Sequence, residues 1–196
     1  MDNTPISDAL ALRATASAFD AQRGKLPVPG DPHRSPDTVA VAVARQISEL
    51  GKLITDLGDE VLFRAAGQDQ APHTARVITS FAAAVEPAGE AASTLGAVAH
   101  QLAFLSQTES LRDQPDARDA REAAVRVLED ALATADAALH DAANSLHAAS
   151  ATVSPPSVRL QAARSRSMTA MPAPGQLPPG VTTAVAAPSD RLARGR

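Results

Sequence analysis

The chain is an alanine-rich sequence of 196 residues with a formal net charge of −4 at pH 7. It contains 44 alanines and 4 phenylalanines but no Trp, Tyr or Cys, which excludes disulfide bonds, thiolate zinc sites and a cysteine nucleophile and disfavours an all-β fold. The N-terminus lacks the basic start and apolar core of a signal peptide, and no stretch of about 18 apolar residues occurs, so we expect a cytoplasmic protein without a transmembrane segment.

A short first helix is predicted over residues 4–23 or 7–23. A threonine at position 4 followed by Pro5 places a capping side chain before a proline at the first helical position, and Gly24 supplies a C-terminal stop. The ten residues KLPVPGDPHR that come next contain three prolines and one glycine, a composition typical of a linker. We therefore assign residues 24–35 to the connection between the first helix and the second.

A second helix is predicted between Ser35 and Gly67. Ser35-Pro36-Asp37 again places a cap before a proline, and Gly67 supplies the stop. The apolar residues along this segment are spaced alternately 4 and 3 positions apart, which is the heptad stripe of a helix that packs against another helix. They are Val43, Ile47, Leu50, Ile54, Leu57 and Val61.

A third helix is predicted from Ala71-Pro72 to Leu105. Its apolar stripe also alternates between 3 and 4 positions, and the register passes through Pro87 without a change of phase. Because a helix that stops and restarts usually resets that phase, we interpret the segment as one long helix kinked at Pro87, with two separate helices as the alternative. The larger members of the stripe are Val77, Phe81, Leu95, Val98, Leu102 and Leu105.

A fourth helix is predicted from Asp116, after a polar loop over Ser106–Pro115, to Val153. Ser154-Pro155-Pro156 ends it, because the residue before a proline disfavours helical geometry. Its heptad stripe includes Leu128, Leu132, Leu139 and Leu146.

These elements predict an all-α fold. A second apolar stripe widens the apolar face of the third helix and of the fourth, which suits a bundle better than a two-stranded coil. We expect residues 1–153 to form an elongated antiparallel helical bundle, with the short first helix and three long ones running up, down, up and down.

The C-terminal segment differs from the bundle in charge and composition. Residues 1–153 carry a formal charge of −9, whereas residues 154–196 carry six arginines and one aspartate, a formal charge of +5. This Pro-, Ala- and Arg-rich tail is predicted to be disordered, because it is too poor in apolar residues to order itself. Arg159, Arg164 and Arg166 are candidate anion contacts, although the tail has no aromatic side chain to stack on nucleic-acid bases.

No catalytic, cofactor or metal site is predicted. The sequence has no Glu-x-x-His pair, no nucleophile elbow and no Gly-rich phosphate loop. His140 and His147 lie seven residues apart and are expected to be exposed. Acidic residues stand four positions from arginines, as Glu122 does from Arg126, which is typical of a solvated helix face.

Two pairs of glycines lie inside the predicted helices. Gly51 and Gly58 are seven residues apart, as are Gly89 and Gly96, so each pair lies on one helix face. Glycine inside a helix costs about 1 kcal/mol relative to alanine. We therefore expect each face either to accept a close neighbour or to leave room for a ligand, and we favour close packing.

The long heptads, without a catalytic constellation, favour a non-enzymatic interaction or scaffold protein that binds itself or a helical protein partner. The predicted interaction seam consists of Ile47, Leu50, Ile54, Leu57, Phe81, Leu95, Val98, Leu102, Leu128, Leu132, Leu139 and Leu146. One alternative is a peripheral protein that coats a membrane or granule surface with its amphipathic helices. Another is a nucleic-acid accessory protein that acts through the basic tail.

Overall fold

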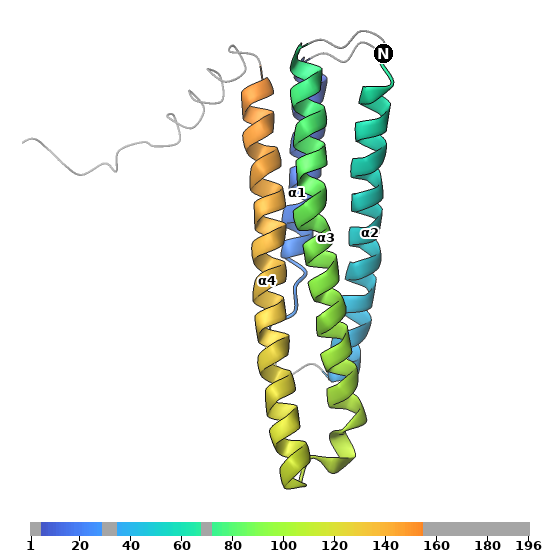
Figure 1. The fold of residues 1–196 in the computed structure, drawn as a ribbon, viewed down its shortest axis with the longest axis vertical. Helices are drawn as coiled ribbons and strands as arrows, with labels where there is room; N and C mark the ends of the chain where they lie inside the picture. The colour runs from blue at the N-terminus through green and yellow to red at the C-terminus, as the bar shows by residue number, and fades with distance from the viewer. Residues whose placement is uncertain (1–4, 29–34, 68–71, 155–196) are drawn as a thin grey trace, which may run out of the picture. The chain divides into compact units, whose positions relative to one another are not determined.

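The computed structural model describes residues 5–28, 35–67 and 72–154, and this part of the chain is an antiparallel bundle of four α-helices (Figure 1). The elements are α1 (Pro5–Arg23), α2 (Pro36–Ala65), α3 (Pro72–Gln107), the single 3₁₀ turn η1 (Glu109–Leu111) and α4 (Pro115–Val153). No helix in these ranges combines the length and apolar character that a membrane span requires. The predicted all-α bundle is therefore confirmed, while the predicted disorder of the tail concerns residues that, Ser154 apart, lie outside the described ranges.

The helix ends agree with the local signals in the sequence. Ser35 caps α2, because its Oγ accepts a hydrogen bond from the Thr38 N–H at 3.3 Å. At the end of α1, the Gly24 N–H donates to the Asp20 carbonyl at 3.0 Å. The α3 helix continues through Pro87, as the unbroken heptad register predicts, and the kink at this proline stays a prediction.

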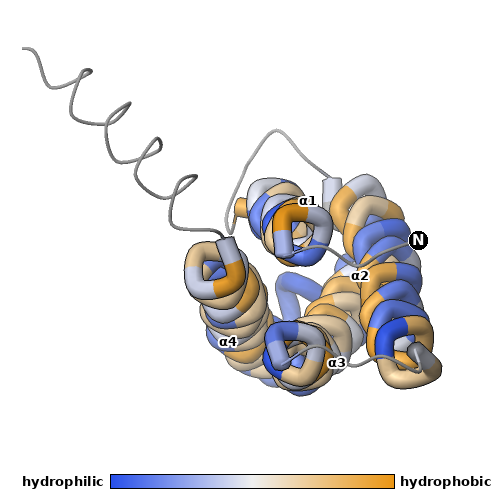
Figure 2. Tube along the Cα trace, turned by 90° about the horizontal axis from the view of Figure 1, so that it is seen from above, coloured by the Kyte–Doolittle hydropathy of each residue, from blue (hydrophilic) through white to orange (hydrophobic). Residues whose placement is uncertain are grey.

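The helices differ in how closely they pack on their neighbours. The α3 helix contacts α2 and α4 along much of its length, and α1 packs mainly on α4. Viewed along the bundle, α1 lies between α4 and α2 (Figure 2), yet it contacts α2 at few points. The α1 helix has 19 residues and α4 has 39, so α1 covers only part of its neighbour.

The core of the bundle combines a few large side chains with many alanines. Phe19 of α1 and Phe81 of α3 are fully buried, and burial of such a side chain contributes about 1.5–3 kcal/mol. Several fully buried core positions on α3 and α4 are alanines, namely Ala84, Ala88, Ala91, Ala135, Ala142 and Ala143. These small side chains allow the helix axes to approach one another closely.

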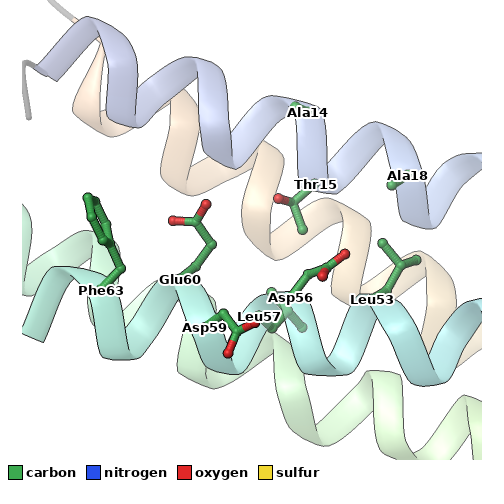
Figure 3. A pocket seen from close by; sticks show the side chains of 9 residues that line it. All are labelled: Ala14, Thr15, Ala18, Leu53, Asp56, Leu57, Asp59, Glu60 and Phe63. Carbon is green, nitrogen blue, oxygen red and sulfur yellow. The ribbon is translucent and has the colours of Figure 1, made fainter. Parts of the chain in front are cut away.

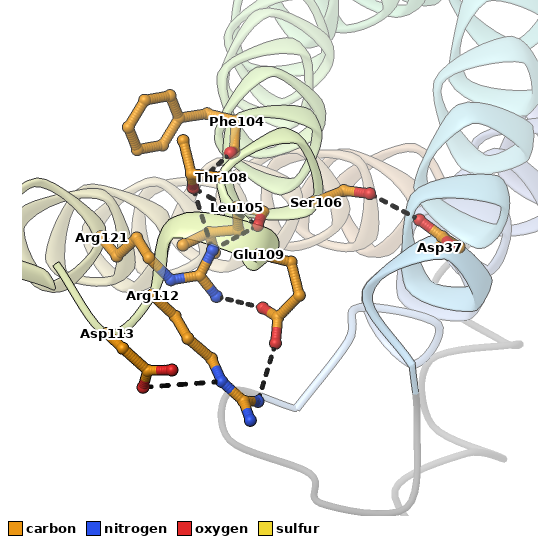
Figure 4. A network of polar contacts seen from close by, with 9 residues as sticks. All are labelled: Asp37, Phe104, Leu105, Ser106, Thr108, Glu109, Arg112, Asp113 and Arg121. Carbon is orange, nitrogen blue, oxygen red and sulfur yellow. Dashed lines mark hydrogen bonds and ion pairs between the residues drawn. The ribbon is translucent and has the colours of Figure 1, made fainter. Parts of the chain in front are cut away.

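The polar segment Ser106–Pro115 is more ordered than a simple loop, because one arginine of α4 organises it (Figure 4). Arg121 Nη1 donates to the Leu105 carbonyl at 2.5 Å and to Thr108 Oγ1 at 2.9 Å. Its Nη2 donates to Glu109 Oε2 at 2.6 Å. The guanidinium thus satisfies a carbonyl that the end of α3 leaves without a helical partner, and it joins α3 to α4.

Candidate functional site

The predicted interaction seam forms the internal core of the bundle. Nine of its twelve side chains are at most 6% exposed: Leu50, Leu57, Phe81, Leu95, Val98, Leu102, Leu132, Leu139 and Leu146. The remaining three, Ile47, Ile54 and Leu128, are partly buried against the same core. The heptad faces therefore contact one another within the chain, and the outer faces of the helices are what a partner would meet.

The α1 and α2 helices face each other but contact at few points (Figure 2). Polar contacts join these two helices near both ends of α1, and a groove separates them in between.

At the N-terminal end of α1, a buried ion pair joins α1 to α2. Arg64 donates from Nε and Nη2 to Asp8 Oδ1, both at 3.3 Å, and Asp8 is 0% and Arg64 5% exposed. Asp8 Oδ2 lies 3.5 Å from His73 Nε2 of α3. Arg64 also pairs with Glu60, and its guanidinium lies 4.9 Å from the centre of the Phe81 ring, a cation–π contact. This cluster connects three helices.

At the C-terminal end of α1, a second polar group joins the same two helices. The Gln46 side-chain amide donates to the Gln22 carbonyl at 2.7 Å in a buried position. Glu49 accepts hydrogen bonds from Lys25 Nζ at 2.5 Å and from Gln22 Nε2 at 2.9 Å. These hydrogen bonds, that of Lys25 first, lower the pKa of Glu49 below its ordinary value, so this carboxylate stays charged.

Between these two ends lies a groove of about 470 Å³, which we call the α1–α2 groove (Figure 3). Its lining residues are Ala14, Thr15 and Ala18 of α1 and Leu53, Asp56, Leu57, Asp59, Glu60 and Phe63 of α2. The α1 side consists of small residues, which leaves space that larger side chains would fill. Leu57, 1% exposed, belongs both to the core and to the groove lining.

The α2 side of the groove combines free acidic groups with an exposed aromatic ring. Glu60 and Phe63 project from α2 toward α1 (Figure 3). Phe63 is 63% exposed, which is unusual for a side chain of this size. Glu60 is paired with Arg64, whereas the side chains of Asp56 and Asp59 form no ion pair or hydrogen bond with the described residues.

On its other side, α1 is fastened to α4 by several polar contacts. Arg23 donates to both carboxylate oxygens of Asp136, at 2.6 and 3.0 Å, and Ser150 Oγ donates to the Ala9 carbonyl at 2.7 Å. The hydrogen bond from Arg23 lowers the pKa of Asp136 below its ordinary value. The α1 helix is therefore held along α4, and its opposite side borders the groove.

The two predicted histidines lie along the α1–α4 contact. His140 Nδ1 is 3.3 Å from Arg23 Nη1, and His147 Nε2 is 2.9 Å from Asp20 Oδ2. His140 is exposed, as predicted, and His147 is partly exposed. Within the described ranges, no group of three or more His, Asp or Glu side chains is arranged to hold a metal ion.

The prediction that the glycine faces pack closely against a neighbour is wrong. A Cβ atom added at Gly51, Gly58, Gly89 or Gly96 would have no heavy atom of a neighbouring element within 4 Å. The heptad spacing correctly placed each pair on one helix face, but it could not tell that this face points away from the adjacent helices.

Sequence reasoning missed the buried ion pair, although the heptad register contained a signal for it. Continuing the α2 stripe three positions beyond Val61 leads to Arg64, and counting four positions back from the buried Leu12 leads to Asp8. A charged residue at a heptad core position must find a partner, because an isolated buried charge is strongly disfavoured. Two opposite charges at such positions on neighbouring helices predict a buried pair.

The candidate anion contacts of the tail, Arg159, Arg164 and Arg166, lie outside the described residues. Their role in binding stays a prediction.

No protein-family model matches the chain, and comparisons with curated proteins and with solved structures found no match.

Proposed function

We propose that this chain is a non-enzymatic adaptor that binds a helical protein partner, or a second copy of itself, through the outer surface of its bundle. The observation that carries the proposal is a set of large apolar side chains exposed on α1 and α2. Leu10, Leu62 and Phe63 are 60, 68 and 63% exposed. Exposed apolar side chains that gather in one region are typical of an interaction surface.

All three residues stand within two positions of the buried ion pair along their helices. Leu10 follows Asp8 by two residues, and Leu62 and Phe63 immediately precede Arg64. The contact between Asp8 and Arg64 therefore places the segments that carry these residues at the same end of the bundle. Of the three, Phe63 lines the groove.

A site-specific photo-crosslinking experiment tests this proposal. A photoreactive amino acid replaces Leu62 in the full chain, and the matched control replaces Val127, which is 46% exposed on α4. Expressed in its native cells, the chain is expected to form a discrete protein crosslink from position 62 and not from position 127. A product of twice the chain's mass indicates a second copy, and any other discrete mass indicates a partner.

Light scattering and liposome flotation complete the test. A strictly monomeric chain that gives no specific crosslink at position 62 refutes the adaptor function. Flotation of the full chain with liposomes or granules would support the surface-coating alternative instead, because an adaptor for proteins stays in the soluble fraction.

A further inference from the structure

We infer that the α1–α2 groove binds a basic amphipathic helix of a partner protein, a proposal that rests on the adaptor function and names its site and the chemistry of its partner. The groove is bordered by two helices, has small side chains on one wall and carries free carboxylates on the other. An amphipathic helix that lays its apolar face into such a groove is a common mode of protein recognition.

The apolar lining favours a helix over an extended strand. Ala14 and Ala18 lie one turn apart on α1, and Leu53 and Leu57 lie one turn apart on α2, so both walls repeat with helical spacing. Phe63 ends the α2 wall. The small alanines allow a third helix axis to come close, and Phe63 offers a large apolar contact to its end.

The charges of the groove select the partner. Among residues 5–28, 35–67 and 72–154, Asp56 and Asp59 form no ion pair, and neither does Lys52, the cation one turn before Asp56. A partner helix with Lys or Arg at the edges of its apolar face would pair with these carboxylates. The same carboxylates disfavour two other occupants. Two copies meeting groove to groove would bring like charges together, and an anionic lipid surface would be repelled.

The polar contacts near the ends of α1 fix the position of both walls of the groove. Arg64 and Asp8 hold α1 near one end of the groove, and Gln46 and Gln22 hold it near the other. A groove whose walls are already in place costs little reorganisation when a ligand binds. Binding is therefore expected without unfolding of α1.

A peptide-binding assay with charge reversal tests the inference on the full chain. The probe is a fluorescein-labelled synthetic peptide of about 14 residues, four helical turns, with Ala and Leu on one face and Lys along both edges. A second probe has Glu in place of every Lys. The test variant is Asp56→Lys/Asp59→Lys, and the control is Glu129→Lys/Asp130→Lys, which changes the net charge equally at two exposed positions of α4.

The expected result is a change of peptide preference that depends on the groove alone. The Lys peptide binds the unaltered chain with saturation, the groove variant weakens this binding about tenfold, and the α4 control changes it less than about twofold. The Glu peptide binds the groove variant better than it binds the unaltered chain. Circular dichroism on each variant verifies that the bundle is intact.

A second variant tests the apolar part of the groove without changing its charge. Ala14→Phe fills the space on the α1 wall and is expected to abolish binding of the Lys peptide, while Ser17→Phe on an exposed position of α1 outside the groove lining leaves it unchanged. Equal weakening by the groove variant and the α4 control, or binding that survives Ala14→Phe, overturns the inference. If the groove inference fails but position 62 still gives a specific crosslink, the adaptor function stands. If position 62 gives no specific crosslink either, the adaptor function itself fails.

Discussion

Replacement of Arg64 by methionine is the most informative perturbation of the bundle. Methionine has a side chain of similar length but lacks the guanidinium that donates twice to Asp8. Asp8 is 0% exposed, and His73, at 3.5 Å from its second oxygen, is the partner that remains. Removing one member of a buried ion pair costs about 3–5 kcal/mol, because the other charge is left in an apolar environment.

The two members of the pair are not equivalent. Asp8→Asn is expected to cost less than Arg64→Met, because Arg64 keeps its ion pair with Glu60 and its contact with the Phe81 ring. The double variant Asp8→Asn/Arg64→Met leaves a neutral buried amide, for which we expect a cost of about 1–3 kcal/mol. The double variant should therefore be more stable than Arg64→Met alone.

Urea unfolding followed by circular dichroism measures these differences, with a solvent-exposed pair as the control. Arg126→Met breaks the pair with Glu122, whose atoms lie 3.0 Å apart and whose side chains are 64 and 65% exposed. Its expected cost is below about 1 kcal/mol. A loss below about 1 kcal/mol for Arg64→Met, or a double variant no more stable than Arg64→Met, would refute the reasoning that a buried pair holds α1 to α2.

Three further predictions concern other parts of the bundle. Gly96→Ala is expected to raise stability by about 0.5–1 kcal/mol, measured as a higher Tm. The Cβ atom of the new alanine would meet no neighbour within 4 Å, and alanine favours the helix more than glycine does. A lower Tm would contradict this. Asp136→Asn lowers the Tm at neutral pH, and the difference disappears on acidification. The hydrogen bond from Arg23 lowers the pKa of Asp136 in the folded protein below its ordinary value of 3.8. The stability that the Arg23–Asp136 pair contributes is therefore complete above pH 3.8 and is lost as the pH falls through the lower pKa of the folded state. A Tm difference that persists in acid would refute this role of the pair. Arg121→Ala leaves the Leu105 carbonyl with only the long hydrogen bond from the Thr108 hydroxyl, at 3.5 Å, among the described contacts. It is expected to cost about 1.5 kcal/mol and to speed amide hydrogen exchange at the end of α3. Arg121→Lys should restore only part of this loss, because one ammonium cannot replace the guanidinium's three contacts.

The helices and their core faces could be predicted from local sequence, whereas the α1–α2 groove could not. Leu50, Leu95 and Leu139 are buried because a repeat of 3 and 4 positions places them on one face of each helix. The groove depends on Ala14 and Ala18 of α1 lying opposite Leu53 and Leu57 of α2. Nothing in the spacing of either helix alone says which other helix it will face.

The glycine pairs and the buried ion pair show the same difference between what the local sequence predicts and what the packing of the helices decides. The register correctly placed Gly89 and Gly96 on one face, but the direction of that face follows from the position of α2 and α4 around α3. Likewise, Asp8 and Arg64 occupy heptad core positions in sequence, and only the packing of α1 against α2 makes them partners.

By itself, the sequence determined the four helices, the Ser35 cap of α2, the continuity of α3 through Pro87 and the apolar face of each helix. These properties depend on residues within a few turns of one another, where hydrogen bonding and side-chain spacing are local. The tertiary structure alone decided that the heptad seams close on one another, that α1 packs on α4 and leaves an acidic groove beside α2, and that Arg64 meets Asp8. Those properties depend on pairing between helices that are distant in sequence, and many pairings satisfy the same heptad pattern.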